Sequence, residues 1–255
     1  MRATILGCGN STGVPMVGNV WGACDPANPR NRRLRSSILV EHEGTTVLVD
    51  SSPDLREQLL AAGVTWLDAV VYTHGHADHL HGIDDLRSIN HYRSGPLDAF
   101  ADAETLATIR ERFGYVFEPI AQGTWMYKPW LIPRLIDGPF RVGALEIRPF
   151  EQHHGHGDKT LGLRFGRLAY STDVLDLPES AFDALAGVET WIVDCLREEP
   201  NPKHVHLERT LAWIARVKPA RAVLTHMNAS LDYARLSARL PAGVEVAYDG
   251  MVIDA

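Results

Sequence analysis

The fold is decided by one stretch of sequence, Thr73-His74-Gly75-His76-Ala77-Asp78-His79. It follows directly on the apolar run 69–72, which is typical of a buried β-strand. Four side chains of metal-ligand type fall within the six residues 74–79. Alternation along an extended turn would direct His74 and His76 to one side, and Asp78 and His79 to the other. The pattern therefore predicts a turn at a strand end that serves two metal ions, in preference to a solvated histidine-rich turn.

This turn resembles the signature motif of the metallo-β-lactamase superfamily. The resemblance implies an α/β (α+β) fold, the αββα four-layer sandwich, in which two mixed β-sheets are flanked by helices. It also implies further metal ligands at the ends of later strands. Three segments of this kind follow in the required order, at residues 150–156, 170–173 and 224–226.

By the same resemblance, the chain holds two divalent metal ions. The resemblance implies that His74, His76 and His154 bind the first metal. It implies that Asp78, His79 and His226 bind the second, and that Asp173 bridges the two. His154 is chosen because the family places this ligand five residues after a proline, here Pro149, and just before a glycine. His153 and His156 remain alternatives. Zinc is the first choice for so many imidazoles, with manganese or iron as alternatives.

Two ions of this kind would share an oxygen and lower its pKa, which generates hydroxide as a nucleophile. An anionic phosphodiester would bind them through its non-bridging oxygens. Asp50, at the end of another predicted strand, has a plausible role in orienting a ligand histidine of the 73–79 turn, or else caps the strand end.

Hydrophobic periodicity predicts strands and helices throughout the chain. The expected strands are 3–6, 37–41, 46–50, 69–73, 145–150, 161–165, 168–171, 190–194, 222–225 and 244–248. The expected helices are 53–62 behind a Ser52 cap, 103–112, 207–217, and 231–240 behind Ser230. Residues 114–143, rich in aromatic residues and proline, predict a long structured loop. Such a loop is functional, or it is a covered edge strand or a dimer contact.

Composition adds limits on size, partners and compartment. Of 255 residues, 45% are hydrophobic and 22% charged, which predicts one domain spanning 1–255. A net charge of −7 argues against stable nucleic-acid binding. Three widely spaced cysteines indicate reduced thiols. No apolar run reaches the length of a signal-peptide core or a membrane span, so we expect a cytoplasmic protein away from membranes.

Both ends of the chain are similar to the PhnP-like phosphodiesterases, a branch related to tRNase Z. The similar stretches are residues 6–15, 21–24, 170–173 and 248–250, together with Asp50. In that branch a histidine before a late helix contacts the scissile phosphate, and His204 matches it. The resemblance thus makes His204 a substrate-binding and catalytic residue, acting as general acid or phosphate donor, with Asp78 as the other catalytic residue. His206 is the competing choice for this histidine.

The chain also departs from PhnP, which holds a structural zinc on a cysteine cluster and an extra histidine. Only Cys24 remains in the corresponding loop and Ala229 stands three residues after His226, so no third zinc is expected. The implied substrates are small or cyclic phosphodiesters or nucleotide-like molecules. A glyoxalase II-like thioesterase or a lactonase on the same dinuclear site is the alternative. Relatives of this kind lead us to expect a homodimer.

Overall fold

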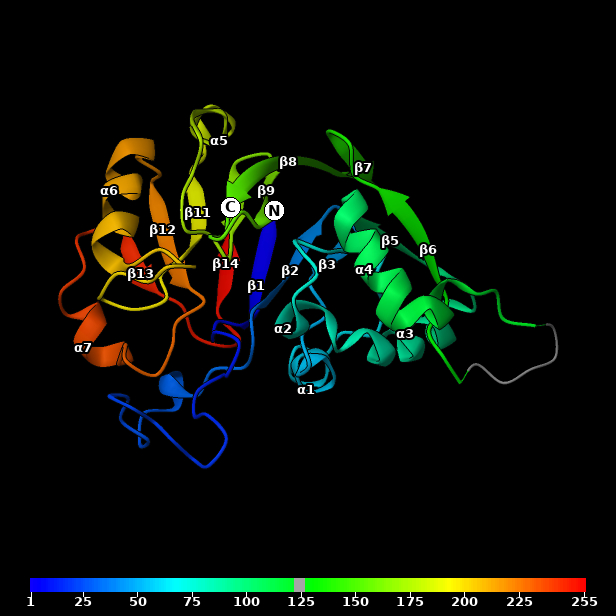
Figure 1. The fold of residues 1–255 in the computed structure, drawn as a ribbon, viewed down its shortest axis with the longest axis horizontal. Helices are drawn as coiled ribbons and strands as arrows, with labels where there is room; N and C mark the ends of the chain where they lie inside the picture. Colours follow the sequence, from blue (N-terminus) through cyan, green and yellow to red (C-terminus); the bar gives the residue numbers. More distant parts are fainter. Residues whose placement is uncertain (122–126) are drawn as a thin grey trace.

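Two seven-stranded β-sheets pack face to face in the computed structural model, which describes residues 1–121 and 127–255 (Figure 1). The first sheet has the order β14 (Val252–Asp254), β1 (Arg2–Gly7), β2 (Ser37–His42), β3 (Thr45–Val49), β4 (Ala69–Val71), β5 (Leu97–Ala101), β6 (Leu131–Leu135). The second has the order β13 (Val244–Val246), β12 (Arg221–Thr225), β11 (Thr190–Asp194), β10 (Leu168–Ser171), β9 (Lys159–Phe165), β8 (Leu145–His153), β7 (Phe140–Val142).

Helices flank the two sheets, which confirms the predicted αββα sandwich (Figure 1). The α-helices are α1 (Leu55–Ala61), α2 (Ala77–Leu80), α3 (Leu86–Arg93), α4 (Ala103–Phe113), α5 (Glu179–Leu185), α6 (Leu207–Val217) and α7 (Tyr233–Ser237). Short 3-10 helices are η1 (Pro29–Asn31), η2 (Ile83–Asp85) and η3 (Gly114–Phe117). Helices α1 to α4 cover the face of the first sheet that points away from the second sheet.

Each sheet joins an antiparallel part to a parallel part. Strands β3 to β6 run parallel in the first sheet, and β10 to β13 run parallel in the second. The carboxyl ends of parallel strands meet at one edge of a sheet, which is where α/β proteins bind their ligands. This arrangement brings the ends of β4, β10 and β12 to the edge where the predicted site residues begin.

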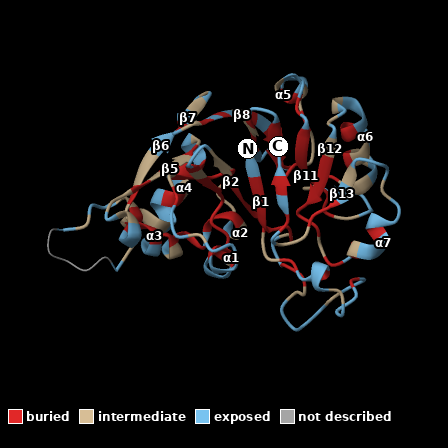
Figure 2. Cartoon of the chain, turned by 180° about the vertical axis from the view of Figure 1, so that it is seen from behind, coloured by how far each residue is buried: buried red, intermediate tan, exposed pale blue. Residues whose placement is uncertain are grey.

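The core divides according to the alternation of side chains along the strands. On β1, Ala3 and Ile5 face the layer between the sheets, whereas Leu6 faces the layer under the helices of the first sheet. On β2, Val40 faces the layer between the sheets and Leu39 faces the layer under the helices. A strand with apolar residues on both faces is buried on both sides, as the red strands in Figure 2 show. The strand ends are therefore held on a rigid scaffold.

The aromatic segment 114–143 is not one long loop. Its residues 131–135 form the edge strand β6 of the first sheet, and 140–142 form the edge strand β7 of the second. Pro133 is compatible with β6 because an edge strand leaves one row of backbone groups unpaired. The edge-strand interpretation therefore holds for these two stretches. Residues 122–126 of the predicted loop, with Trp125 among them, lie outside the described residues.

Both predicted serine caps were wrong. Helix α1 begins after Asp54, so Ser52 lies two residues before the N-cap; its hydroxyl accepts the Asp54 N–H at 3.1 Å and donates to Gln58 Oε1 at 3.0 Å. Helix α7 begins after Asp232, whose carboxylate accepts the Arg235 N–H at 3.0 Å, as a short N-cap side chain does.

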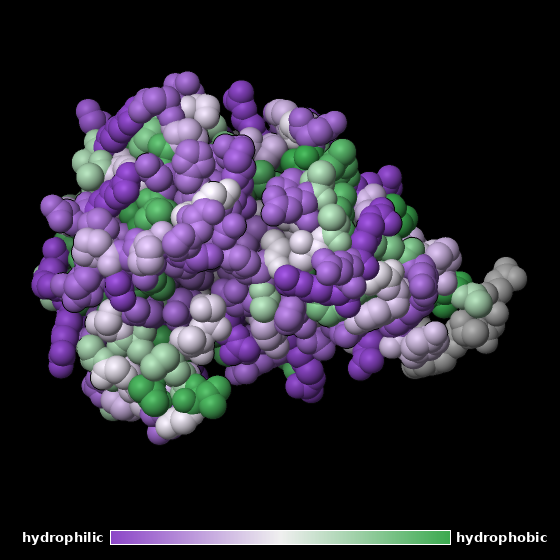
Figure 3. Space-filling model, in the orientation of Figure 1, coloured by the Kyte–Doolittle hydropathy of each residue, from purple (hydrophilic) through white to green (hydrophobic). Residues whose placement is uncertain are grey.

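The surface seen in Figure 3 is largely hydrophilic, with scattered apolar residues. Among the described residues, no helix has both the length and the apolarity needed to cross a membrane.

Candidate metal centre

All seven side chains of the predicted ligand set converge at the shared edge of the two sheets. They form two groups whose donor atoms lie within 4.8 Å of one another: His74, His76, His154 and Asp173; Asp78, His79, Asp173 and His226. The residues come from the turn after β4, the end of β8, the end of β10 and the end of β12. Asp173 belongs to both groups, and its place between them is the geometry expected of a bridging carboxylate.

The two carboxylate oxygens of Asp173 face different groups. Its Oδ1 lies 3.9 Å from His74 Nε2 and 3.7 Å from His154 Nε2. Its Oδ2 lies 2.9 Å from His79 Nε2 and 3.3 Å from His226 Nε2. One carboxylate therefore offers one oxygen to each set of imidazoles.

Buried imidazole nitrogens without a hydrogen-bond partner show that these residues fit metal ions. Nε2 of His74 and Nε2 of His226 are buried and make no hydrogen bond. A buried polar atom left unsatisfied costs about 1–3 kcal/mol, so native proteins rarely retain one without a purpose. A divalent cation that binds to the lone pairs of these nitrogens would remove that cost. Imidazole together with carboxylate is a donor set typical of zinc.

The pKa values in the first group favour metal binding as well. Burial lowers the pKa of His74 well below its usual range and that of His154 to about 4, in spite of the Asp173 carboxylate. These imidazoles are neutral at physiological pH, and a metal ligand must be deprotonated.

The second group carries an excess of negative charge around its imidazoles. Burial opposes protonation of His226, but Asp173, Asp78 and Asp194 outweigh it and raise the pKa of His226 to about 9. Burial also opposes protonation of His79, and the carboxylates of Asp173 and Asp78 raise its pKa. In the absence of an ion, protons on these imidazoles balance the carboxylates, so this half of the site calls for a cation.

Backbone conformation directs two of these side chains. Asp173 and His226 both have positive φ, at 53° and 56°, which is uncommon for residues other than glycine. Each stands just after its strand, where the left-handed turn points the side chain across the sheet edge. Strain of this kind is typical of functional sites.

Asp50 supports the 73–79 turn from beneath. Its Oδ2 lies 2.7 Å from His79 Nδ1, and its Oδ1 accepts the Thr73 N–H at 2.8 Å. The Thr73 hydroxyl donates to Asp50 Oδ2 at 2.8 Å and lies 2.9 Å from His74 Nδ1. A carboxylate on the far nitrogen of a ligand histidine fixes the ring and its tautomer, which is the role that we predict for Asp50.

His204 lies at the rim of the cluster and is held by a residue that the sequence analysis did not single out. Its Nδ1 is 3.0 Å from Asp194 Oδ2, and its Nε2 points towards Asp173 Oδ1 at 3.9 Å. The Asp194 carboxylate also accepts the Val174 N–H at 3.1 Å. The available signal was that Asp194 ends strand β11, which lies between the strands that precede Asp173 and His226.

The competing histidines lie elsewhere. His153 is exposed, with its Nε2 3.6 Å from Glu151 Oε1, and the exposed His156 belongs to neither group. His206 stands at the N-cap of α6 without a side-chain capping bond. The structure therefore brings His154 and His204 to the cluster.

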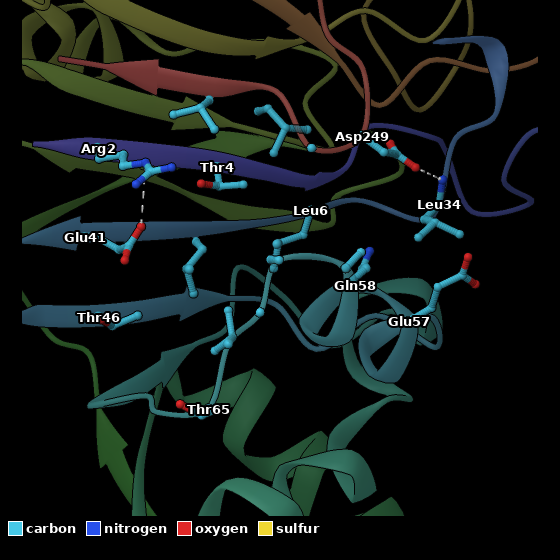
Figure 4. A pocket seen from close by; sticks show the side chains of 18 of the residues that line it. Arg2, Thr4, Leu6, Leu34, Glu41, Thr46, Glu57, Gln58, Thr65 and Asp249 are labelled. Carbon is cyan, nitrogen blue, oxygen red and sulfur yellow. Dashed lines mark hydrogen bonds and ion pairs between the residues drawn. The ribbon is translucent and has the colours of Figure 1, made fainter. Parts of the chain in front are cut away.

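A cavity of about 680 Å³ lies away from this cluster, on the outer face of the first sheet beside α1 (Figure 4). Arg2, Glu41 and Gln58 line it, and Asp249 borders it while accepting the Leu34 N–H at 2.6 Å. No residue of the two ligand groups lines this cavity, so its size does not make it the reaction site.

Comparison with known proteins agrees with this geometry. Residues 45–227 match the family described as Beta-lactamase superfamily domain. The chain belongs to this superfamily. A crystal structure of a new diphosphatase from the PhnP family is similar over 100% of this chain and 97% of its own, with a TM-score of 0.89 and 31% identity, which confirms the PhnP-like resemblance. Superfamily and cluster together indicate a hydrolase with a metal-binding site.

Two further proteins are similar to this chain. An octanoyltransferase of Porphyromonas gingivalis is 35% identical over 98% of this chain, which spans only 51% of that protein. Zn²⁺-bound PqqB from Methylobacterium extorquens shares the fold, with a TM-score of 0.76, 21% identity and full coverage of both chains.

Proposed function

We propose that this protein is a dinuclear metal-dependent phosphodiesterase that hydrolyses small or cyclic phosphodiesters. The observation that carries the proposal is the split of the Asp173 carboxylate between two groups of ligand side chains. A two-metal site suits phosphodiester hydrolysis, because two cations stabilise the attacking and the leaving oxygen of an in-line displacement. The proposed substrates include cyclic ribose phosphates and nucleotide-like diesters.

The chain's own residues would hold the ions in two sites. His74, His76 and His154 would bind the first, Asp78, His79 and His226 the second, and Asp173 both. Bound there, the ions would lower the pKa of a shared water and neutralise charge on the phosphate. Zinc is our first choice, with manganese and iron as alternatives.

His204 would supply or hold a proton at the substrate. Asp194 accepts the Nδ1–H of His204, which leaves Nε2 directed at the cluster. Protonated at Nε2, the imidazole can donate to a phosphate oxygen or to the departing alkoxide, as a general acid does. Its side chain is 15% exposed, so substrate can reach it while the Asp194 contact stays dry.

The similarity to a PhnP-family diphosphatase supports hydrolysis at phosphorus over acyl chemistry, because it covers both chains almost completely. The octanoyltransferase is about twice as long as the part of it that this chain matches, so its name describes a longer protein. It is nevertheless a specific reason to test an octanoyl thioester. A thioesterase or lactonase on the same site is therefore the second candidate.

The deciding experiment measures hydrolysis of bis(p-nitrophenyl) phosphate, with bound metal quantified in the same sample. An octanoyl thioester and a lactone are assayed in parallel, each after reconstitution with zinc, manganese or iron. We expect diester hydrolysis with about two metal ions per chain. Metal-loaded protein that cleaves the thioester or the lactone and not the diester would replace this proposal with the second candidate.

We also propose a cytoplasmic homodimer that binds small molecules and forms no stable complex with nucleic acid or membrane. The net charge of −7 supports the absence of a stable nucleic-acid complex, because such binding depends on positive charge. Multi-angle light scattering of the purified chain tests the dimer, and a single-chain mass at micromolar concentration would refute it.

A further inference from the structure

A buried arginine joins the loop between β1 and β2, residues 8–36, to the loop between β12 and α7, residues 226–232. Arg33 is 1% exposed, although arginine is almost never fully buried unless its charge is paired. Its Nη1 donates to the Asn228 carbonyl at 3.0 Å, and its Nη2 donates to the Leu231 carbonyl at 2.6 Å. One side chain of the 8–36 loop therefore holds the 226–232 loop at two points.

The backbone of Arg33 is itself fixed. Its N–H donates to the Val14 carbonyl at 2.8 Å, and its carbonyl accepts the Val14 N–H at 2.9 Å. The guanidinium holds its N–H donors in a rigid plane, so two carbonyl oxygens that bind to it cannot move independently. The 226–232 loop is therefore held at a fixed position relative to the 8–36 loop.

Backbone contacts join the same two loops around the guanidinium. The Met227 N–H donates to the Cys8 carbonyl at 2.9 Å, and the Ala23 N–H donates to the Ala229 carbonyl at 2.8 Å. At Gly22, whose φ is +58°, an added Cβ would lie 2.4 Å from the Ala229 carbonyl oxygen, so the backbones are in close contact there. The two loops are thus packed together along their length.

The ring of His226 is held differently from that of His79, the other histidine of the second ligand group. His79 Nδ1 lies 2.7 Å from Asp50 Oδ2, which orients the ring. Among the described residues, Nδ1 of His226 is buried without a hydrogen-bond partner, because Asp194 Oδ1 is 3.8 Å away and too distant for a hydrogen bond. The orientation of the His226 ring therefore depends on the position of its own backbone.

The backbone of His226 has a strained conformation that the 226–232 loop must maintain. Its φ is 56°, in the left-handed region that residues other than glycine rarely adopt. Strain of this kind persists only where the surrounding structure fixes it. The Asn228 carbonyl, which Arg33 binds, lies two residues further along the chain. Arg33 therefore stabilises the turn that directs His226 towards the second ligand group.

The first ligand group is built on other segments of the chain. Its histidines lie in the turn after β4 and at the end of β8, whereas Arg33 binds the loop after β12. We propose that Arg33 is a positioning residue for the second metal ion, because it fixes the backbone of the ligand His226. Replacing Arg33 should then affect the two metal ions unequally. This inference rests on the two-ion site of the proposed function.

Metal titration of the purified, metal-free protein tests this role. Zinc is added in competition with a chromophoric chelator, which gives separate dissociation constants for the first and the second ion. Plasma emission spectroscopy gives the number of ions bound. A parallel titration with cobalt(II) identifies the occupied site, because the visible absorption of cobalt depends on its ligands. His226→Ala supplies the reference spectrum for a protein that lacks the second ion.

Two variants of Arg33 separate its charge from its hydrogen-bond geometry. Arg33→Met removes both, and we expect the dissociation constant of the second ion to rise about 10- to 100-fold while that of the first changes less than about twofold. At limiting cobalt, its absorption should match that of His226→Ala. Arg33→Lys keeps the charge without the rigid plane of donors, so the rise should be smaller, about three- to tenfold.

The matched control is Arg30→Met. Arg30 lies in the same loop but is exposed; its Nη1 donates to the Tyr233 hydroxyl at 2.8 Å, and its guanidinium lies 4.6 Å from the centre of the Tyr248 ring. These contacts lead to α7 and to the segment before β14, not to the turn at His226. Both ions should therefore bind Arg30→Met as tightly as they bind the unaltered protein.

Two results would overturn the role of Arg33. One is unchanged affinity for the second ion in Arg33→Met, and the other is a loss that is equal for both ions or is matched by Arg30→Met, which would indicate a general loosening of the loop. If Arg33→Met does not fold, unchanged affinity for the second ion in Arg33→Lys overturns the role. Failure of the proposed function looks different, because the unaltered protein would then bind two ions and cleave no phosphodiester. An unaltered protein that binds fewer than two ions would contradict both proposals.

Discussion

Asp50 and Asp194 occupy similar places in the two sheets, yet they organise different kinds of site. Both are fully buried, Asp50 after β3 and Asp194 at the end of β11, and each of these strands lies beside a strand that precedes a proposed ligand. The hydrogen bonds of the Asp50 carboxylate all go to one seven-residue turn, at Thr73 and His79. Those of the Asp194 carboxylate go to two separate segments, at Val174 and His204.

The difference separates a local half of the site from an assembled half. In the local half, one contiguous turn, residues 73–79, supplies four of the proposed metal ligands. In the assembled half, Asp194 joins two separate segments of the chain, and one of them carries His204, the proposed proton donor. Variants of the two halves should therefore fail in different ways.

The largest effect is expected where the halves meet. Asp173→Ala should lower kcat/KM for a phosphodiester by roughly a thousandfold or more, because several kcal/mol of charge stabilisation depend on the paired ions. It should also lower bound metal from about two ions to about one per chain, measured by plasma emission spectroscopy. Asp183→Ala, an exposed change on α5, is the control. Full activity or unchanged metal content in Asp173→Ala would contradict the proposal that Asp173 binds both metal ions.

The assembled half is tested by His204→Ala. We expect both metal ions to remain and kcat to fall about a hundredfold or more, because a positioned general acid contributes that much. The measurement is turnover of bis(p-nitrophenyl) phosphate on samples of known metal content. His206→Ala, two residues further on, is the matched control, since its side chain makes no capping bond. A larger loss of kcat in His206→Ala than in His204→Ala would make His206 the proton donor in place of His204.

The comparison itself is tested by changing the two aspartates in parallel. Asp50→Asn should weaken metal binding about 10- to 100-fold, because the ring of His79 loses the carboxylate that orients it. Asp194→Asn should instead lower kcat and leave metal binding closer to that of the unaltered protein. Zinc titration against a chromophoric chelator measures the first effect and steady-state kinetics the second. Equal metal loss in both variants would show that the halves are not separable.

The same division explains how much of the site could be predicted from sequence. The 73–79 turn is contiguous, so its residue types and spacing indicate metal directly. Asp194 could not be predicted, because an aspartate at a strand end is common and its place between Asp173 and His226 depends on the order β10, β11, β12 in the sheet. The contacts of Arg33 with Asn228 and Leu231 join residues 195 and 198 positions apart and have no local pattern.

The fold shows a similar contrast between strong and weak local patterns. Strands rich in β-branched residues, such as β3 and β11, were predicted within about a residue. Strand β5 has the sequence Leu-Asp-Ala-Phe-Ala, with weak strand propensity, and it exists because β4 and β6 pair with it on both sides. Helices α3 and α5 were missed because seven or eight residues carry too few apolar positions to show a period.

The half-buried Asp249 sharpens the comparison, because its carboxylate accepts from backbone N–H groups and not from an imidazole. Asp249 Oδ1 accepts the Cys8 N–H at 3.0 Å and Oδ2 accepts the Leu34 N–H at 2.6 Å. Burial raises the pKa of Asp249 to about 6, although these backbone donors act in the opposite direction. Asp50 also has a raised pKa from burial, but His79 opposes the rise.

Asp249 should therefore leave a signature in the pH dependence of stability. Between about pH 4 and pH 6 the folded chain holds this proton and the unfolded chain does not, so the contribution of Asp249 falls as pH rises through that window. Its size is on the order of 2 to 3 kcal/mol. Asp249→Asn loses one backbone hydrogen bond, which costs about 1–3 kcal/mol, and loses the titration. Denaturant unfolding at several pH values should show a stability difference between the two proteins that shrinks from about pH 4 to pH 7. A constant difference would mean that the backbone donors keep Asp249 ionised, and then burial alone would not distinguish it from the aspartates of the metal centre.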